Sequence, residues 1–234
     1  MGGPTTNDLS GVARISEEGS IIVSIFNTIK RLLGLSPELH DTLQQNCFRA
    51  KYLVIDLELT GLNPKKDEIV SLAWLPIEEQ RIFVGQSEHF INSHVNELKQ
   101  SPIFHGIDSH ALEGGVPLIS ALQQLRPLLD QYVLVFHNAE LDWLFLKNAF
   151  GQFNMPVAPT LMVDTMKIEH KRLSLQGQEI GFDDLNLAAC RARYSLPEYL
   201  THNALTDALA TAELFLAQLN KITGGKGVEL RQLV

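Results

Sequence analysis

The sequence predicts an α/β domain in which a mixed five-stranded sheet is flanked by helices, preceded by an N-terminal helical extension. Two observations indicate this class. Apolar runs of strand length at 52–58 and 132–136 are separated by a segment that includes a helix, which favours a parallel crossover pair. Two further runs, at 68–75 and 81–91, follow the first after connections too short for parallel strands. The sheet is therefore expected to be mixed.

The composition fits one globular domain with an appendage. Of the 234 residues, 45% are hydrophobic and 20% are charged, and this length supports one sizeable core. The net charge of -8 argues against a broad electrostatic grip on duplex DNA, although a protein that handles only a strand end needs few phosphate contacts. No apolar run approaches the roughly 20 residues that cross a bilayer, and no signal segment is evident. We expect no membrane span and a cytoplasmic location.

Residues 1–19 and 20–50 are expected to form a flexible tail and a helical extension. The tail holds few large apolar residues. In the extension, apolar residues recur at helical spacing over 20–35, and a second short helix is expected from 37 to about 49. The first helix is amphipathic. Its apolar face is expected either to pack on the domain or to contact a protein partner or a membrane surface.

The main domain is expected at 51–220, with a C-terminal tail at 221–234. Its first three strands form a meander, and the loop-rich stretch 92–116 follows; a loop this long is often functional. The crossover helix is expected at 117–129. The later elements are a helix at 139–150, a short strand ending near 164, and helices around 165–172, 182–193 and 204–219. Cys47 and Cys190 are far apart and are expected to be buried free thiols.

Two acids end the first predicted strand. Asp56 and Glu58 are two residues apart, and because side chains alternate along a strand they project from the same face. Like charges at the end of a core strand are unfavourable unless one takes a proton or a cation neutralises them. Hard cations such as Mg²⁺ or Mn²⁺ prefer oxygen ligands of this kind. Taken alone, the pair fits a metal site and a solvated strand end equally well.

A second polar segment follows the strand at 132–136. Asn138 is expected to cap the next helix, and Asp142 lies in its first turn, where the helix dipole favours an anion. An acid there is also ordinary helix design. However, the preceding strand should lie beside the strand of Asp56 and end on the same side of the sheet, where ligands of such sheets bind. We therefore expect Asp142 near Asp56.

The third segment contains His202 and Asp207. On one continuous helix these two residues would be separated by about 140° and could not share a face. If Asn203 caps the helix instead, Asp207 occupies the first turn and His202 lies in the preceding loop, free to reach the same point. An imidazole titrates near neutral pH, which suits a general base beside the acids.

Three segments together resemble the motifs of the DEDDh family of 3′ to 5′ exonucleases, which have the ribonuclease H-like fold and include proofreading subunits of bacterial polymerases. They read Asp56-Leu57-Glu58-Leu59-Thr60-Gly61, His137-Asn138-Ala139-Glu140-Leu141-Asp142 and His202-Asn203-Ala204-Leu205-Thr206-Asp207. The resemblance runs from about Lys51 to about Leu219, and all the charged positions of the family motifs match. Glu140-Leu141 before Asp142 departs from the second motif, and Leu59 departs from the first by replacing a threonine; neither change removes a ligand. The Leu-Glu-Leu run that Leu59 completes is also similar to oligoribonuclease, which leaves the choice of DNA or RNA open.

This resemblance implies two-metal hydrolysis at the 3′ end of single-stranded nucleic acid, with release of nucleoside 5′-monophosphates. His202 would deprotonate the attacking water, and the ligands of two divalent cations, Mg²⁺ or Mn²⁺, would be Asp56, Glu58, Asp142 and Asp207. The substrate-binding residues would be Thr60, Gly61, Leu62, His137 and Asn138. A path for the strand, or else solvated helix faces, would be formed by Lys167, Lys171, Arg172, Arg191 and Arg193.

Three functions stay open at this point. An exonuclease that prefers DNA is the leading hypothesis, and an exoribonuclease that acts on short RNA is the first alternative. The second alternative is a non-catalytic, nucleic-acid-binding scaffold that retains the fold. Loss of a ligand position would favour the scaffold, and none is lost. The sequence does not indicate an oligomeric state.

Overall fold

The computed structural model describes residues 37–98, 101, 106–157, 160–199 and 202–234. The chain divides into two compact units, Met1–Leu43 and Gln44–Val234. The expected tail at 1–19 and the amphipathic helix at 20–35 lie outside the described residues. The next helix, α2 (Pro37–Gln44), ends earlier than expected. The side chain of Asn46 accepts a hydrogen bond from Phe48 N at 2.8 Å, which favours a turn over further helix.

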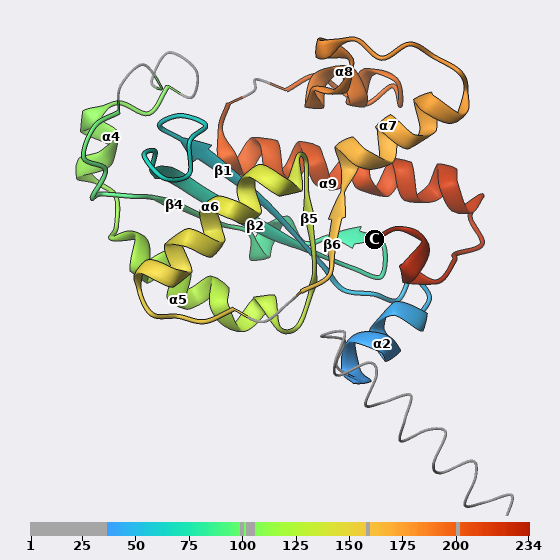
Figure 1. The fold of residues 1–234 in the computed structure, drawn as a ribbon, viewed down its shortest axis with the longest axis horizontal. Helices are drawn as coiled ribbons and strands as arrows, with labels where there is room; N and C mark the ends of the chain where they lie inside the picture. Colours follow the sequence, from blue (N-terminus) through green and yellow to red (C-terminus); the bar gives the residue numbers. More distant parts are fainter. Residues whose placement is uncertain (1–36, 99–100, 102–105, 158–159, 200–201) are drawn as a thin grey trace, which may run out of the picture. The chain divides into compact units, whose positions relative to one another are not determined.

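The second unit contains a mixed sheet flanked by helices (Figure 1). Its main path is β3-β2-β1-β5-β6. The central strand β1 (Tyr52–Leu59) pairs antiparallel with β2 (Ile69–Glu78) and parallel with β5 (Val133–Phe136). In turn, β5 pairs parallel with β6 (Met162–Asp164). The mixed sheet and the crossover between β1 and β5 are confirmed.

The sheet has six strands rather than the expected five, because the third expected strand is two. β3 (Arg81–Ile82) and β4 (Glu88–Ile91) both pair with β2, and the 3-10 helix η1 (Val84–Gln86) separates them. Pro76 of β2 explains the break. Its carbonyl accepts from Phe83 N at 3.0 Å, but its ring nitrogen has no hydrogen to donate in return.

Helices cover both faces of the sheet. One face carries α5 (Leu118–Leu129) and α6 (Ala139–Gln152), and the other carries α9 (Ala204–Thr223) (Figure 1). Leu53 and Ile55 of β1 pack into the core beneath α5 and α6. Tyr52 faces α9, where its ring meets Phe215 edge-on with centroids 4.8 Å apart. The same alternation places positions 56 and 58 on the α9 face.

Shorter elements connect these layers. Helix α4 (Ser109–Glu113) lies within the loop-rich stretch, and α7 (Thr165–Leu175) follows β6. The helix expected at 182–193 is two elements, η2 (Phe182–Leu185) and α8 (Leu187–Ala192). Asn186 separates them because its backbone is extended, and its side chain caps α8 by accepting a backbone N–H at 2.8 Å.

The segment after α9 packs against its own unit. Leu230, in the 3-10 helix η3 (Leu230–Gln232), and Leu233 are buried in the α9 core. Cys47 N donates to Val228 O at 2.8 Å, which joins this segment to the residues before β1. Cys47 and Cys190 are both buried and free, as expected. Within the described part of the chain, no helix combines the length and apolarity that a bilayer span needs.

Candidate active site

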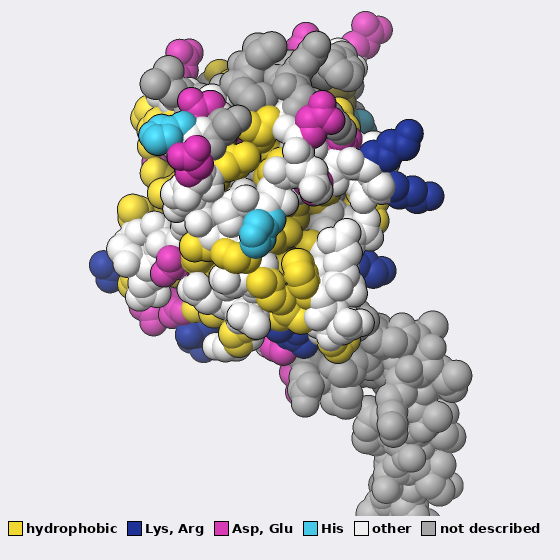
Figure 2. Space-filling view, turned by 90° about the vertical axis from the view of Figure 1, so that its left-hand side faces the viewer, with side chains coloured by type: hydrophobic (Ala, Val, Ile, Leu, Met, Phe, Trp, Pro, Cys, Tyr) yellow, Lys and Arg dark blue, Asp and Glu magenta, His cyan; other side chains and the backbone are white. Residues whose placement is uncertain are grey.

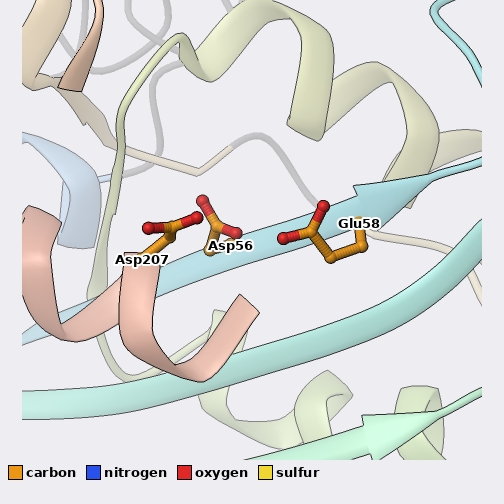
Figure 3. Close-up of side chains that lie close together, drawn as sticks. All are labelled: Asp56, Glu58 and Asp207. Carbon is orange, nitrogen blue, oxygen red and sulfur yellow. The ribbon is translucent and has the colours of Figure 1, made fainter. Parts of the chain in front are cut away.

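Three carboxylates from two distant segments meet on the α9 face of the sheet. Asp56 and Glu58 project from β1, and Asp207 projects from the first turn of α9. One carboxylate oxygen of each residue lies within 4.8 Å of the others. In Figure 3 the three side chains point into the same space beside the strand. Residues far apart in the chain therefore form one anionic cluster, as the sequence predicted.

Local structure directs these side chains. The ladder between β1 and β2 shifts register between Glu58 and Leu59, a bulge that ends the regular alternation just beyond the acid pair. Asn203 caps α9 by accepting the N–H three residues on at 3.2 Å, which places Asp207 in the first turn. The backbone of His202 is in the left-handed region, with φ 70°. Its N–H donates to Asp207 Oδ2 at 2.7 Å. The expected cap and the preceding loop position of His202 are confirmed.

Burial and mutual repulsion disfavour the ionised forms of the cluster. Burial, then the Asp207 charge, raises the pKa of Glu58 to about 7. Burial, followed by the charge of Asp142, raises the pKa of Asp56 well above its ordinary value. Burial also raises the pKa of Asp207, although the hydrogen bond from His202 N opposes that shift. The cluster carries an electrostatic cost that a cation would relieve.

The donor set fits a hard divalent cation. All three candidate ligands are carboxylate oxygens, the type that Mg²⁺ and Mn²⁺ prefer. Asp207 Oδ1 is buried and has no hydrogen-bond partner among the described residues. A buried oxygen of this kind is costly unless an ion or water reaches it. The geometry therefore supports a metal site at Asp56, Glu58 and Asp207.

Asp142 lies outside this group of three but within electrostatic reach of it. It is buried in the first turn of α6. Burial, then the charge of Asp164, raises its pKa well above the ordinary value, and the charge of Asp142 in turn raises the pKa of Asp56. The expected closeness of Asp142 to Asp56 agrees with this coupling. Its place in a second cation site stays a prediction.

The expected cap of α6 was wrong in one respect. Asn138 occupies the N-cap position, but its side chain makes no cap hydrogen bond and its backbone is left-handed, with φ 77° and ψ 56°. The neighbouring ring of His137 is held on both nitrogens: Nδ1 lies 2.8 Å from Thr165 Oγ1, and Nε2 lies 2.9 Å from Leu185 O. Burial lowers the pKa of this ring. These contacts make His137 a support of the site's wall, and direct substrate contact by either residue stays a prediction.

The loop after β1 leaves one of its three predicted substrate residues open to solvent. Thr60 is buried, and its Oγ1 accepts from Glu68 N at 2.9 Å. A Cβ added at Gly61 would lie 2.5 Å from Asp67 Oδ2, so a larger residue there would have to displace that carboxylate. Leu62 is 75% exposed, so its side chain is available to a ligand.

The five cations predicted to line a strand path separate into two groups. Arg191 and Arg193 are held in ion pairs with acidic neighbours, at nitrogen to oxygen distances of 2.8 and 3.5 Å. Arg172 is also ion-paired, with Glu169 at 2.6 Å, but together with Lys167 and Lys171 it lines a groove of about 800 Å³ beside α6 and α7 whose other walls are mostly apolar. The three clustered carboxylates do not line this groove. A strand path along these cations stays a prediction.

The surface beyond the groove offers little positive charge on at least one side. On the face shown in Figure 2, hydrophobic and uncharged polar atoms occupy the centre, and Lys and Arg side chains project mainly from its margins. The net charge of the chain is -8. Both observations favour a ligand held at few phosphates over one bound along a broad basic surface.

Comparison with known proteins identifies the family. An exonuclease family model, RNase_T, matches residues 53–215. The chain belongs to this exonuclease family. The exonuclease is 31% identical over 192 residues to ribonuclease T of Haemophilus ducreyi. The matched region covers 73% of this chain and 85% of that relative. It is 28% identical over 190 residues to the 3′-5′ exonuclease DinG of Bacillus subtilis, which covers 79% of the chain but only 19% of DinG.

Solved structures share the fold of the exonuclease. The nuclease domain of 3′hExo, a DEDDh family member bound to rAMP, gives a TM-score of 0.63 at 12% identity and covers 79% of this chain and 99% of that one. The complex of E. coli exonuclease I with single-stranded DNA gives a TM-score of 0.62 at 15% identity. The match covers 76% of this chain and 42% of exonuclease I. The expected ribonuclease H-like fold is confirmed. By family, the chain is an exonuclease, and the proteins it is similar to include a 3′-5′ exonuclease and a DEDDh family member.

The sequence motifs gave no role to Asp164, which lies at the end of β6. One signal for it was present, because an acid that ends a strand and opens a helix is a cap pattern. That pattern predicts a contact with α7 only. It contains no sign that the same carboxylate reaches α6, which begins at Ala139.

Proposed function

We propose that this exonuclease hydrolyses the terminal phosphodiester bond at the 3′ end of single-stranded nucleic acid, prefers DNA to RNA, and releases nucleoside 5′-monophosphates. The observation that carries the proposal is the meeting of Asp56, Glu58 and Asp207 within 4.8 Å in a cluster that fits a cation. The single-stranded DNA bound to E. coli exonuclease I, which shares the fold, supports the choice of DNA.

A second candidate is an exoribonuclease that acts on short RNA. The relative from Haemophilus ducreyi is named ribonuclease T, and the 3′hExo domain is bound to rAMP. Both strands would use the same carboxylates, so the choice depends on how the site treats the 2′-hydroxyl. The scaffold hypothesis is the weakest of the three, because the four acids and His202 are all retained.

The carboxylates would hold two divalent cations, Mg²⁺ or Mn²⁺. Asp56, Glu58 and Asp207 would hold the first, and Asp142 would contribute to the second. When bound, such cations stabilise the negative charge that develops on the phosphate and on the leaving oxygen.

His202 would act as the general base. Its side chain is exposed in the loop before α9, and its backbone bond to Asp207 keeps that loop beside the cluster. The imidazole would accept a proton from the attacking water while the water oxygen bonds to phosphorus. The bond from phosphorus to the 3′ oxygen then breaks, and that oxygen leaves on the shortened strand and takes a proton from solvent. Leu62 would pack against the terminal base.

The proposed activity is tested with single strands labelled at the 5′ end, incubated with Mg²⁺, Mn²⁺ or EDTA. Stepwise shortening from the 3′ end is expected with either metal and none with EDTA. Asp56→Asn is expected to be inactive. Glu140→Gln is a matched control, because Glu140 is an exposed acid in the first turn of α6, two residues before Asp142. No release of monophosphates with either metal would contradict the proposal.

The choice between DNA and RNA needs strands of the same base sequence. We expect a higher kcat/KM on DNA, measured with both strands present so that they compete for the enzyme. A higher value on RNA would assign the second candidate function instead. Biological activity that survives in Asp56→Asn would favour the scaffold over either enzyme.

A further inference from the structure

One carboxylate binds the N-termini of two helices. Asp164 ends β6 and caps α7 in the usual way, because its Oδ1 accepts from Met166 N at 2.9 Å and from Lys167 N at 3.3 Å. The same side chain also serves α6. Its Oδ1 accepts from Asn138 N at 3.2 Å, and its Oδ2 accepts from Ala139 N at 3.1 Å. Asp164 is buried, and its oxygens are therefore occupied by four backbone donors.

Helix α6 depends on this carboxylate because it lacks a cap of its own. Its N-cap residue, Asn138, makes no side-chain cap bond and has a left-handed backbone, a conformation that Asn adopts more readily than most residues. Ala139 is buried, so its N–H would be left without a partner if Asp164 were absent. The negative charge of Asp164 also suits the positive ends of both helix dipoles.

Asp142 is the functional side chain at this end of α6. It follows Ala139 by three residues, within the same first turn, so any shift of the helix start moves it directly. The strand register limits where that start can lie. Asp164 of β6 is paired with Phe136 of β5, the last strand residue before the turn into α6. A short, rigid path therefore leads from Asp164 to Asp142.

The next residue, Thr165, extends the same link to α9. Its Oγ1 donates to Phe136 O at 3.1 Å, and its carbonyl accepts from Gln218 Nε2 at 2.9 Å. Gln218 is buried on α9, the helix whose first turn carries Asp207. Asp164 and Thr165 together connect the three helices α6, α7 and α9.

We propose that Asp164 is a positioning residue that holds Asp142 in place, and that it is not itself a cation ligand. All four of its hydrogen bonds are to backbone N–H groups at helix starts, three to Oδ1 and one to Oδ2, so an ion at either oxygen would compete with the bonds that hold α6 and α7. The inference rests on the proposed role of Asp142 in binding a second cation. It assigns Asp164 a task that acts through Asp142 rather than on the substrate.

Asp164→Asn is the informative variant, because it keeps the size of the side chain but replaces one acceptor oxygen with an NH₂ group. We expect kcat to fall about 10- to 100-fold, the range typical when a group behind a metal ligand is removed, while KM for a short strand stays within about twofold. The Mn²⁺ concentration for half-maximal activity should rise. Excess Mn²⁺ should restore much of the kcat of Asp164→Asn but not that of Asp142→Asn, which lacks the ligand itself.

Asp108→Asn controls for the loss of a helix cap as such. Asp108 caps α4 by accepting from Ala111 N at 2.9 Å, and it is not part of the proposed site. This control should lower Tm slightly and leave kcat and the Mn²⁺ response unchanged. A kcat of Asp164→Asn equal to wild type, measured where both proteins are folded, would overturn the proposal. So would a loss of kcat that excess Mn²⁺ does not relieve.

The result can be separated from a failure of the proposed function. If the wild-type protein hydrolyses no strand, that function fails, and Mn²⁺ binding is followed directly by electron paramagnetic resonance. Weaker Mn²⁺ binding in Asp164→Asn than in Asp108→Asn would still support a positioning role. Equal binding in the two variants would contradict it.

Discussion

The backbone N–H of His202 donates to Asp207 Oδ2 at 2.7 Å, so the proposed general base and a proposed cation ligand are joined through the main chain. This bond does not involve the imidazole. Removal of the His202 side chain should therefore leave the Asp207 carboxylate oriented as before. The base and the metal site can then be tested separately.

His202→Ala is predicted to lower kcat by about 10²- to 10⁴-fold and to flatten the rise of the rate with pH. A general base accepts the proton of the attacking water in its unprotonated form, so catalysis by such a group gives a rate that rises with pH. Saturating Mn²⁺ keeps the carboxylates ionised during the measurement. The checks are kcat/KM across pH and Mn²⁺ affinity, which should stay near wild type. A pH profile with the same rising limb as wild type would remove His202 from the mechanism.

The metal-free protein is predicted to lose stability as pH rises from about 4.5 to about 7. Burial and the Asp207 charge raise the pKa of Glu58 from 4.5 to about 7, so the folded state binds more protons than the unfolded state in this window. By linkage, the free energy of unfolding then falls with rising pH. Glu58→Gln should remove this loss and stabilise the metal-free protein above pH 7, by on the order of 3 kcal/mol at most.

Thermal unfolding in EDTA at pH 5 and pH 8 measures this effect. The Tm of Glu58→Gln should exceed that of wild type at pH 8 and approach it at pH 5. Glu140→Gln, which changes an exposed acid, should follow wild type at both values. Added Mn²⁺ should then raise the Tm of wild type more than that of Glu58→Gln, because a bound ligand stabilises the folded state. Equal Tm values for Glu58→Gln and wild type at pH 8 in EDTA would contradict the prediction.

The central strands and the last long helix could be predicted from the sequence, because continuous or regularly spaced apolar residues report burial directly. The cluster could also be predicted. Alternation along β1 fixes the shared face of Asp56 and Glu58, and the cap at Asn203 fixes the turn that carries Asp207. These are local rules that act over a few residues.

The remaining features depend on contacts between distant residues. The break between β3 and β4 is caused by Pro76 on the neighbouring strand, which no pattern within 81–91 contains. The cap of α6 comes from Asp164, which is 25 residues after Ala139. Local sequence patterns instead predict that Asn138 caps this helix. Tertiary contacts of this kind need the fold before they can be recognised.

Leu62→Ala is predicted to weaken substrate binding without changing stability. Leu62 is 75% exposed, so its truncation should change the free energy of unfolding by less than about 0.5 kcal/mol. If it packs against the terminal base, KM for a single strand should rise about fivefold, the equivalent of about 1 kcal/mol. Val84→Ala is the control, because Val84 is 55% exposed on η1 and does not line the groove beside α6 and α7. Equal KM values for the two variants would exclude the proposed contact.

Lys171→Glu is predicted to weaken binding of long strands and to leave the cleavage of a dinucleotide unchanged. Lys171 is exposed on the groove beside α6 and α7, which the three clustered carboxylates do not line, so we expect it to contact phosphates upstream of the cut bond. The binding constant of a single strand falls as the salt concentration rises. Each phosphate contact that is lost should make the slope of log K against log salt concentration shallower by about 0.7.

Lys226→Glu makes the same change of charge at an exposed position that does not line the groove, so it separates a local contact from a change in net charge. Binding of a long strand is measured at several salt concentrations in EDTA, where no cleavage occurs. A smaller salt slope in Lys171→Glu than in Lys226→Glu would assign the groove to the strand. Equal slopes would mean that Lys171 is a solvated residue of α7, and the path of the strand would have to leave the cluster in another direction.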